Sequence, residues 1–297
     1  MEQAGRTAIV TGAGGGLGRC HALQLARLGA RVVVNDLNEA AAKAVVEEIV
    51  AGGGEALAFE GSVTDEARVA VMVDEAMARF GRIDILVNNA GILRDKSFAK
   101  MTMADFRLVV EVHLMGAAIC SKAVWEIMRA QQYGRIVMTT SSSGLYGNFG
   151  QANYGAAKMA LVGLMQTLAI EGAKHNIRVN ALAPTAATAM TEGLLSAEAL
   201  ALLGPEKVSP GLLALVGDEA PTRAILCAGA GHFATANVTL TAGCQVGSGP
   251  SVAQDVVNSW SRISERDGEI VPAYGFTQAE RELRSAGYSD LLLAEDR

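Results

Sequence analysis

The chain carries the glycine-rich stretch Thr11-Gly12-Ala13-Gly14-Gly15-Gly16-Leu17-Gly18 directly after a short β-branched run, Thr7-Ala8-Ile9-Val10. A segment of helical character follows, from about Leu17 to Leu28. Glycine backbone can turn tightly and approach a pyrophosphate, and the start of the next helix offers free N–H groups. The order strand, glycine turn, helix therefore predicts a dinucleotide site. Its expected contacts are Gly12, Gly14, Gly15, Gly16, Leu17 and Gly18.

Short β-branched runs alternate with longer helical segments over residues 6–183. The alternation indicates βαβ units and a parallel, doubly wound sheet with helices on both faces. With Ala224-Ile225-Leu226-Cys227 as a seventh strand, it predicts an α/β single-domain Rossmann fold with a mostly parallel seven-stranded sheet. The six earlier runs begin at Thr7, Arg31, Ala56, Ile83, Arg135 and Ile177.

The chain changes character twice after this region. Residues 186–215 have little strand character, and we expect them to form a mobile cover over the site. After Gly243 the chain becomes polar, and a glycine-rich joint precedes two predicted helices, Ser251 to Ile263 and Thr277 to Ala286. We therefore expect residues 1–246 to form the Rossmann domain and residues 247–297 a polar helical extension.

Composition excludes several classes of protein. Half of the 297 residues are hydrophobic, which argues against disorder, and the net charge of -6 with scattered Lys and Arg argues against a nucleic-acid partner. No basic leader with a hydrophobic run and no long apolar window is present, so we expect a soluble, cytoplasmic protein without a membrane segment. The four widely spaced cysteines form no metal or redox pair, so no metal is expected.

The second predicted strand ends at Asn35-Asp36, about 20 residues beyond the glycine turn, where an acidic side chain can bind the adenosine ribose and repel a 2′-phosphate. Gly15 also offers no basic side chain to such a phosphate. The sequence therefore favours NAD over NADP, although Asp36 as an ordinary strand-end cap is the alternative.

Two further strand ends face the same edge. Asn88-Asn89-Ala90-Gly91 ends the fourth strand; the two asparagines are expected mainly to bond neighbouring backbone, with Asn89, Ala90 and Gly91 also against the cofactor. Ser62 and Val63, after the third strand, either border the adenine or form a simple turn.

Tyr154-Gly155-Ala156-Ala157-Lys158 places a phenol and an ammonium one helical turn apart. A phenol with its ordinary pKa of about 10 is a poor base at neutral pH, and a nearby cation stabilises the phenolate. Tyr154 can then take the proton of an alcohol as hydride leaves its carbon, while Lys158 also holds the nicotinamide ribose. Thr139-Thr140-Ser141-Ser142-Ser143 supplies hydroxyls at the carboxyl edge of the sheet, one of which should bond the substrate oxygen.

These motifs together resemble the short-chain dehydrogenase/reductase family over nearly the whole chain. The resemblance implies that the catalytic serine stands thirteen residues before the tyrosine, which is Ser141, and that Pro184 and Thr188 meet the cofactor. It also implies a homodimer or homotetramer. Thr185 replaces the glycine that usually follows the proline. His113 stands where much of the family has a catalytic asparagine; it either holds a water that relays protons to Lys158 or is structural.

Residues 91–98, 133–138 and 144–154 resemble one branch of the family, the (3R)-hydroxyacyl-CoA dehydrogenase units of peroxisomal multifunctional enzymes, also named type 4 17β-hydroxysteroid dehydrogenases. This resemblance implies NAD-dependent oxidation of a (3R)-hydroxyacyl-CoA. The alternatives are a hydroxysteroid or steroid side-chain CoA substrate and, from another class, an NAD-binding sensor that turns nothing over. Arg94, Lys96 and Lys100 are candidate CoA contacts or parts of a solvated loop.

Overall fold

The computed structural model describes residues 2–187 and 196–288. The chain divides into two compact units, Met1–Ala236 and Asn237–Arg297. The division therefore falls after residue 236, whereas the change in composition had suggested residue 246.

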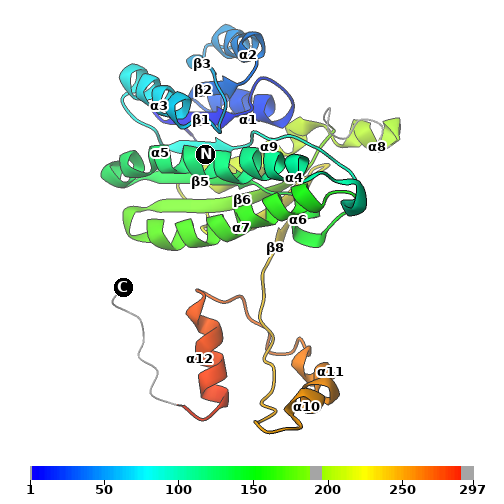
Figure 1. Ribbon diagram of the computed structural model, residues 1–297. Coiled ribbons are helices and arrows are strands. Elements are labelled where there is room, and N and C mark those ends of the chain that lie inside the picture. Colours follow the sequence, from blue (N-terminus) through cyan, green and yellow to red (C-terminus); the bar gives the residue numbers. More distant parts are fainter. Residues whose placement is uncertain (1, 188–195, 289–297) are drawn as a thin grey trace. The chain divides into compact units, whose positions relative to one another are not determined.

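The first unit alternates strands and helices as its sequence predicts (Figure 1). Its elements in chain order are β1 (Thr7–Thr11), α1 (Gly16–Arg27), β2 (Arg31–Asp36), α2 (Glu39–Ala51), β3 (Ala56–Glu60), α3 (Glu66–Phe80), β4 (Ile85–Asn88), η1 (Phe98–Lys100), α4 (Met103–Val110), the π-helical turn η2 (Glu111–Met115), α5 (Gly116–Gln131), β5 (Gly134–Thr139), α6 (Ser142–Tyr146), α7 (Ala152–Gly172), η3 (Ala173–His175), β6 (Ile177–Thr185), α8 (Ala197–Leu202), η4 (Pro205–Lys207), α9 (Ser209–Val216), β7 (Ile225–Gly229) and β8 (His232–Ala236).

The described strands form one sheet in the order β3-β2-β1-β4-β5-β6-β7-β8. All neighbouring pairs are parallel except β7 and β8. The order reverses beside β1, whose neighbours are β2 and β4, and such a switch point is where ligands bind in open α/β sheets. This confirms the predicted doubly wound Rossmann fold.

The eighth strand is absent from the sequence prediction. Ala230 and Gly231 both have positive φ and form a two-residue turn between Gly229 and His232, which folds β8 back antiparallel onto β7. Most of β8 is exposed, so it lacks the apolar pattern by which the buried strands were recognised.

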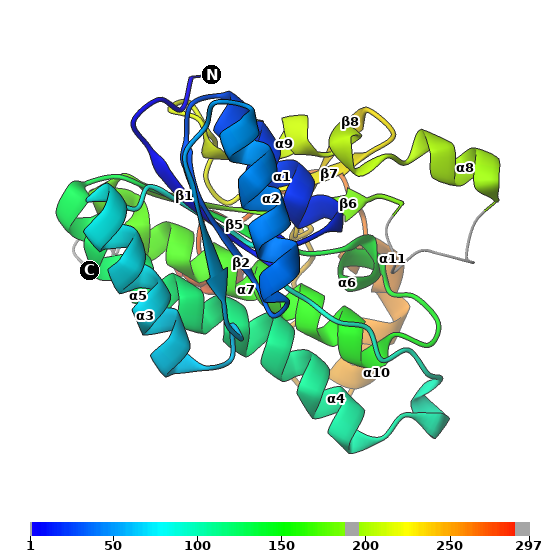
Figure 2. The ribbon, with the colours of Figure 1, turned by 90° about the horizontal axis from the view of Figure 1, so that it is seen from above.

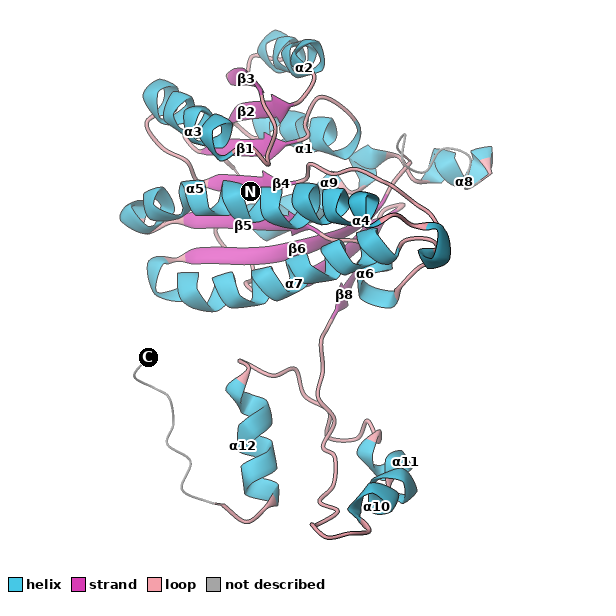
Figure 3. Ribbon diagram, in the orientation of Figure 1, coloured by secondary structure: helices cyan, strands magenta, loops and turns pink. Residues whose placement is uncertain are grey.

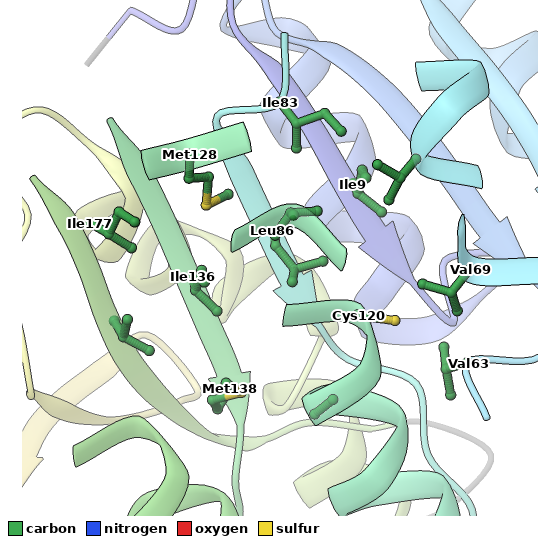
Figure 4. Packing of buried hydrophobic residues seen from close by; sticks show 14 of the residues in the cluster. Ile9, Val63, Val69, Ile83, Leu86, Cys120, Met128, Ile136, Met138 and Ile177 are labelled. Carbon is green, nitrogen blue, oxygen red and sulfur yellow. The ribbon is translucent and has the colours of Figure 1, made fainter. Parts of the chain in front are cut away.

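Two layers of helices enclose the sheet (Figure 2). Helices α3, α5 and α7 pack on one face, and α1, α2 and α9 on the other. On the first face, Ile9, Leu86 and Ile136 of three adjacent strands lie in one buried cluster with Cys120 and Met128 of α5 (Figure 4). This core fixes the carboxyl ends of the central strands relative to one another.

Helix α9 corrects the expectation of a mobile cover over residues 186–215. Val208, Leu212 and Leu215 are buried in the second core cluster, so this part of the predicted cover belongs to the core. This apolar run packs against the sheet because removing apolar surface from water is favourable. Within the predicted cover, residues 188–195 lie outside the described part of the chain.

One continuous helix, Met103–Gln131, is long enough and apolar enough (mean hydropathy 1.4) to suit a membrane span by length and composition alone. Its α5 portion buries Cys120, Val124 and Met128 against the sheet. Core helices of such folds share this composition, and the apolar side here is the side that meets the protein interior.

The second unit contains α10 (Val252–Asn258), α11 (Trp260–Ile263) and α12 (Phe276–Ser285) (Figure 3). Leu240 and Ile270 form an isolated antiparallel bridge. The predicted helix from Ser251 to Ile263 is thus present as two short helices, and the second predicted helix begins one residue early. None of the described residues 237–288 is buried.

Candidate active site

The glycine turn joins β1 to α1 at the carboxyl edge of the sheet. Gly12 and Gly16 have φ of +61° and +52°, a conformation that favours glycine. A Cβ on Gly12 would lie 2.8 Å from Ala90 Cα, so the turn can pack this closely against the end of β4 only with glycine there.

The start of α1 is open to a ligand. No side chain caps this helix end, and a Cβ added at Gly15 would meet nothing within 4 Å. Its first N–H groups therefore remain available to an anion, and the helix dipole favours one there. The described residues of the turn fit the pyrophosphate of a dinucleotide.

Asp36 ends β2 beside this turn. Its Oδ2 accepts a hydrogen bond from Gly14 N–H at 2.9 Å, and its Oδ1 accepts one from Asn38 N–H at 2.9 Å. The carboxylate thus has the strand-end role that was the alternative, and it also contacts the glycine turn, which places it where a ribose site would be. The preference for NAD over NADP that Asp36 is expected to give remains a prediction.

Asn88, the last residue of β4, and Asn89, which follows it, have different surroundings. Asn89 Nδ2 donates to the carbonyls of Thr11 (2.9 Å) and Gly12 (3.0 Å), which ties β4 to the turn. Asn88 Nδ2 donates to Ser121 Oγ at 3.1 Å in the interior. Thr11, which sequence reasoning missed, accepts at Oγ1 from the N–H groups of Asn89 and Ala90. Asn89 therefore bonds neighbouring backbone as expected, whereas Asn88 bonds the Ser121 side chain. Contact of Asn89 with the cofactor remains a prediction.

Ser62, Val63 and Pro184 are further predicted cofactor contacts that the structure describes. Ser62 Oγ is bonded to Thr64 Oγ1 at 2.8 Å, as in a turn, and Val63 is buried next to Gly116. Pro184 lies near the end of β6, and Thr185 follows it there. Thr188 lies outside the described residues.

Ser141, Tyr154 and Lys158 are brought together from two elements. Ser141 follows β5 and caps α6, where its Oγ accepts from Ser143 N–H at 3.2 Å. Tyr154 and Lys158 share one side of α7, with Lys158 Nζ 5.4 Å from the centroid of the Tyr154 ring. Nζ donates to the Thr139 carbonyl at 2.5 Å, so the lysine is held by the strand that carries the serine.

The pKa values of Tyr154 and Lys158 differ from the expectation that a charged lysine lowers the pKa of the phenol. Burial raises the pKa of Tyr154, the hydrogen bond with Ser141 lowers it, and the Asp95 carboxylate raises it. Burial also lowers the pKa of Lys158 to about 7. Lys158 is therefore only partly charged at neutral pH, and the lowering of the phenol pKa by a permanent ammonium is not seen. Desolvation of the two neighbouring groups outweighs it.

His113 lies on the π-helical turn and faces the same group. Its ring meets the Tyr154 ring edge to face, and its Nε2 contacts the Ile92 carbonyl at 2.8 Å. Burial lowers the pKa of His113 to about 3, so the imidazole is neutral. A cavity of about 10 Å³, close to the space of one water, is lined by His113, Asn88 and Lys158 among others. The structure thus places His113 beside the lysine, and its predicted relay role remains a prediction.

Sequence reasoning missed the contacts that join the loop after β4 to the start of α7. Three successive residues of the loop take part: the Arg94 carbonyl accepts from Asn153 Nδ2 (3.1 Å), Asp95 Oδ2 from Gln151 Nε2 (2.6 Å), and Lys96 N–H donates to the Gly150 carbonyl (2.9 Å). We call these three contacts the loop seam. The matched residues lie 50 to 60 positions apart, and a lone polar residue in a loop gives no signal of its partner.

No group of three His, Cys, Asp or Glu residues suited to a metal occurs within the described ranges. Cys20, Cys120, Cys227 and Cys244 are all free thiols. The side chains grouped with Tyr154 carry hydroxyl, amine and imidazole groups.

Known proteins are similar to this chain in sequence. Residues 6–199 match the family model described as short chain dehydrogenase. The peroxisomal hydratase-dehydrogenase-epimerase of Saccharomyces cerevisiae is 44% identical over 97% of this chain, and the chain spans 32% of that protein's length.

Two solved structures are similar to the fold. The full-length peroxisomal multifunctional enzyme type 2 of Drosophila melanogaster has a TM-score of 0.82 and 37% identity, over 96% of this chain and 50% of that one. A 7α-hydroxysteroid dehydrogenase complexed with NADH and 7-oxo glycochenodeoxycholic acid has a TM-score of 0.72 and 33% identity, over 77% of this chain and 95% of that one.

Proposed function

The chain belongs to the short-chain dehydrogenase family, and from that premise we propose that it oxidises a (3R)-hydroxyacyl-CoA to the 3-oxoacyl-CoA with NAD. The observation that carries the proposal is the grouping of Ser141, Tyr154 and Lys158 beside an open glycine turn. A protein that only bound the nucleotide would have no need of this grouping.

The residues present fit a nicotinamide dinucleotide. The first N–H groups of α1 would hold the pyrophosphate, and Asp36 would accept hydrogen bonds from the adenosine ribose and repel a 2′-phosphate. Lys158 would hold the nicotinamide ribose. When bound, the cofactor supplies the acceptor for a hydride.

The proton of the alcohol is handled by this chain's own side chains. Ser141 Oγ orients the substrate oxygen, and Tyr154 accepts the alcohol proton during oxidation or returns it during reduction. Lys158, whose pKa is about 7, can take up or release a proton near neutral pH. Because the phenol pKa is raised in the free protein, Tyr154 is protonated at neutral pH, which is the form that reduction needs.

The acyl-CoA assignment draws on the family branch. Peroxisomal multifunctional relatives match nearly the whole chain, and residues 144–154 carry the sequence by which the branch was recognised. A hydroxysteroid is the second candidate, because the 7α-hydroxysteroid dehydrogenase shares the fold at 33% identity.

Initial rates of NAD reduction test these proposals directly. The substrates are a (3R)-hydroxyacyl-CoA, its (3S) epimer and a 17β-hydroxysteroid, each repeated with NADP. Preference for the (3R) thioester with NAD supports the proposal. Turnover of the steroid alone would move the substrate assignment to the second candidate, and the absence of reduced nucleotide with every alcohol would leave a binding protein.

A further inference from the structure

The Asp95 carboxylate has a defined place in the loop seam. Its Oδ2 accepts from Gln151 Nε2 at 2.6 Å, and within the described ranges no Lys, Arg or His lies within salt-bridge distance of it. Asp95 is close enough to Tyr154 to disfavour the phenolate. Asp95 is exposed, and its negative charge acts on the Tyr154 phenol.

Gln151 fixes that carboxylate to the catalytic segment. Its Oε1 accepts from Ser143 Oγ at 2.7 Å while its Nε2 donates to Asp95. The Ser143 N–H in turn donates to Ser141 Oγ. The Gln151 amide, three residues before Tyr154, thus links the loop after β4 to the segment that carries Ser141.

The rest of the loop seam holds the same geometry. Asn153 is fully buried, and its amide donates to the Arg94 carbonyl while its Oδ1 accepts from Tyr154 N–H at 2.8 Å. Movement of the loop would therefore disturb the first turn of α7, and a rigid seam keeps the carboxylate at one place.

Resting on the proposed function, we propose that Asp95, positioned by Gln151, is a specificity determinant that admits substrates uncharged next to the reacting carbon and rejects free 3-hydroxy acids. A thioester is neutral two bonds from the carbinol, whereas the carboxylate of a free 3-hydroxy acid carries a negative charge there. Like charges repel, and the repulsion grows where a bound substrate displaces the water between them.

The other charged and titratable groups near Tyr154 come from the π-helical turn, from α7 and from the loop after β4. His113, on the π-helical turn, is neutral because its pKa is about 3, and Lys158, on α7, has a pKa of about 7 and so is only partly charged. Arg94 and Lys96 flank Asp95 in sequence and are exposed. They are the groups that would attract a free acid if the proposal were wrong.

The test compares a neutral short thioester of a (3R)-hydroxy acid with the free acid of the same chain length. Asp95→Asn keeps an oxygen that can accept from Gln151 and removes the charge; Asp74→Asn, on the exposed face of α3, is the matched charge control. Asp95→Asn should raise kcat/KM for the free acid relative to the thioester by about tenfold. An unchanged ratio, or one that Asp74→Asn changes equally, overturns the proposal.

A double variant tests the positioning role of Gln151. Gln151→Glu sets two carboxylates against each other and should lower kcat/KM for the thioester by about tenfold. Adding Asp95→Asn supplies an amide that can donate to the introduced carboxylate, which still accepts from Ser143, and should restore kcat/KM to within about threefold. Circular dichroism and NADH fluorescence check folding and cofactor binding. A Gln151→Glu variant as active as the parent, or no rescue, contradicts the role.

Failure of the proposed function would look different. If the protein oxidises only a steroid, the pH profile of that reaction still reports on Asp95, because loss of its charge should move the acidic limb to lower pH. An unmoved limb counts against Asp95 whatever the substrate, and a moved limb supports its place beside Tyr154.

Discussion

The Tyr154 ring stands edge-on to the His113 ring, with centroids 5.2 Å apart and planes at 87°. The imidazole is kept there by Ile92 and by Gly91, where a Cβ would lie 2.9 Å from His113 Nδ1 and closer still to Cε1. The glycine after β4 thus determines where the histidine lies, and the histidine limits where the phenol can lie.

Gly91→Ala should displace the His113 ring. Overpacking of this kind costs about 1–3 kcal/mol of unfolding free energy, and we expect turnover to fall by about tenfold or more because the Tyr154 ring loses its neighbour's support. Urea unfolding and initial rates measure the two effects. Gly163→Ala is the control: it lies on the exposed side of α7 with open space at its Cβ, and it should gain about 0.5–1 kcal/mol. Equal stability of the two variants would contradict the packing argument.

Tyr154→Phe should lower turnover by about a hundredfold to ten-thousandfold, the usual contribution of a general acid or base. In the parent protein, oxidation needs the deprotonated phenol, whose pKa is raised by burial. The rate of oxidation should therefore increase as the pH rises above neutrality, and the rate of reduction should not. Rates in both directions over the same pH range check this, and a flat oxidation profile would argue against Tyr154 as the base.

Asp36→Asn should weaken the preference for NAD. The amide keeps an oxygen to accept from the Gly14 N–H and removes the charge that would repel a 2′-phosphate. We expect the ratio of kcat/KM for NAD over NADP to fall by about a hundredfold. Asp65→Asn, at the start of α3, removes a charge from another helix cap and should leave the ratio unchanged.

Two buried histidines make stability depend on pH. Burial lowers the pKa of His21 to about 4 and that of His113 to about 3, from 6.5. Below pH 6.5 the unfolded chain therefore binds more protons than the folded protein. The stability that comes from keeping both imidazoles neutral is complete above pH 6.5 and is lost as the pH falls toward 4 for His21 and toward 3 for His113. Each histidine should add a slope of about 1.4 kcal/mol per pH unit.

Urea unfolding at a series of pH values measures that slope. His21→Gln removes one titrating group. The slope of its unfolding free energy against pH should therefore be smaller by the contribution of one histidine, whatever the absolute stability of the variant. His175→Gln is the control, because His175 is the last residue of η3 and is only half-buried. The same slope in parent and His21→Gln would show that His21 does not titrate as its burial implies.

The fold was readable from sequence where periodicity reports burial. The runs at β1, β2, β4 and β5 are buried along nearly their whole length, so hydrophobic patterning located them and their alternation with helices implied parallel order. Strand β8 was missed because it is exposed and depends on a two-residue turn. Helix α9 was misjudged because an apolar run with Pro210 and Gly211 at its start shows no clear period.

The site was predictable to the extent that its chemistry follows local spacing. Tyr154 and Lys158 are neighbours on one helix, and the glycine turn is contiguous. The Asp95–Gln151 contact joins loops 56 residues apart, and its existence depends on side-chain placement. The lowered pKa of Lys158 likewise follows from burial in the folded protein.

Asp36 already holds the Gly14 N–H and so keeps the turn between β1 and α1 in its final shape before a nucleotide arrives. The conformational entropy of that loop is lost when the protein folds and not when it binds. A rigid receptor of this kind loses less freedom on association, so a larger part of the contact energy is expressed as affinity.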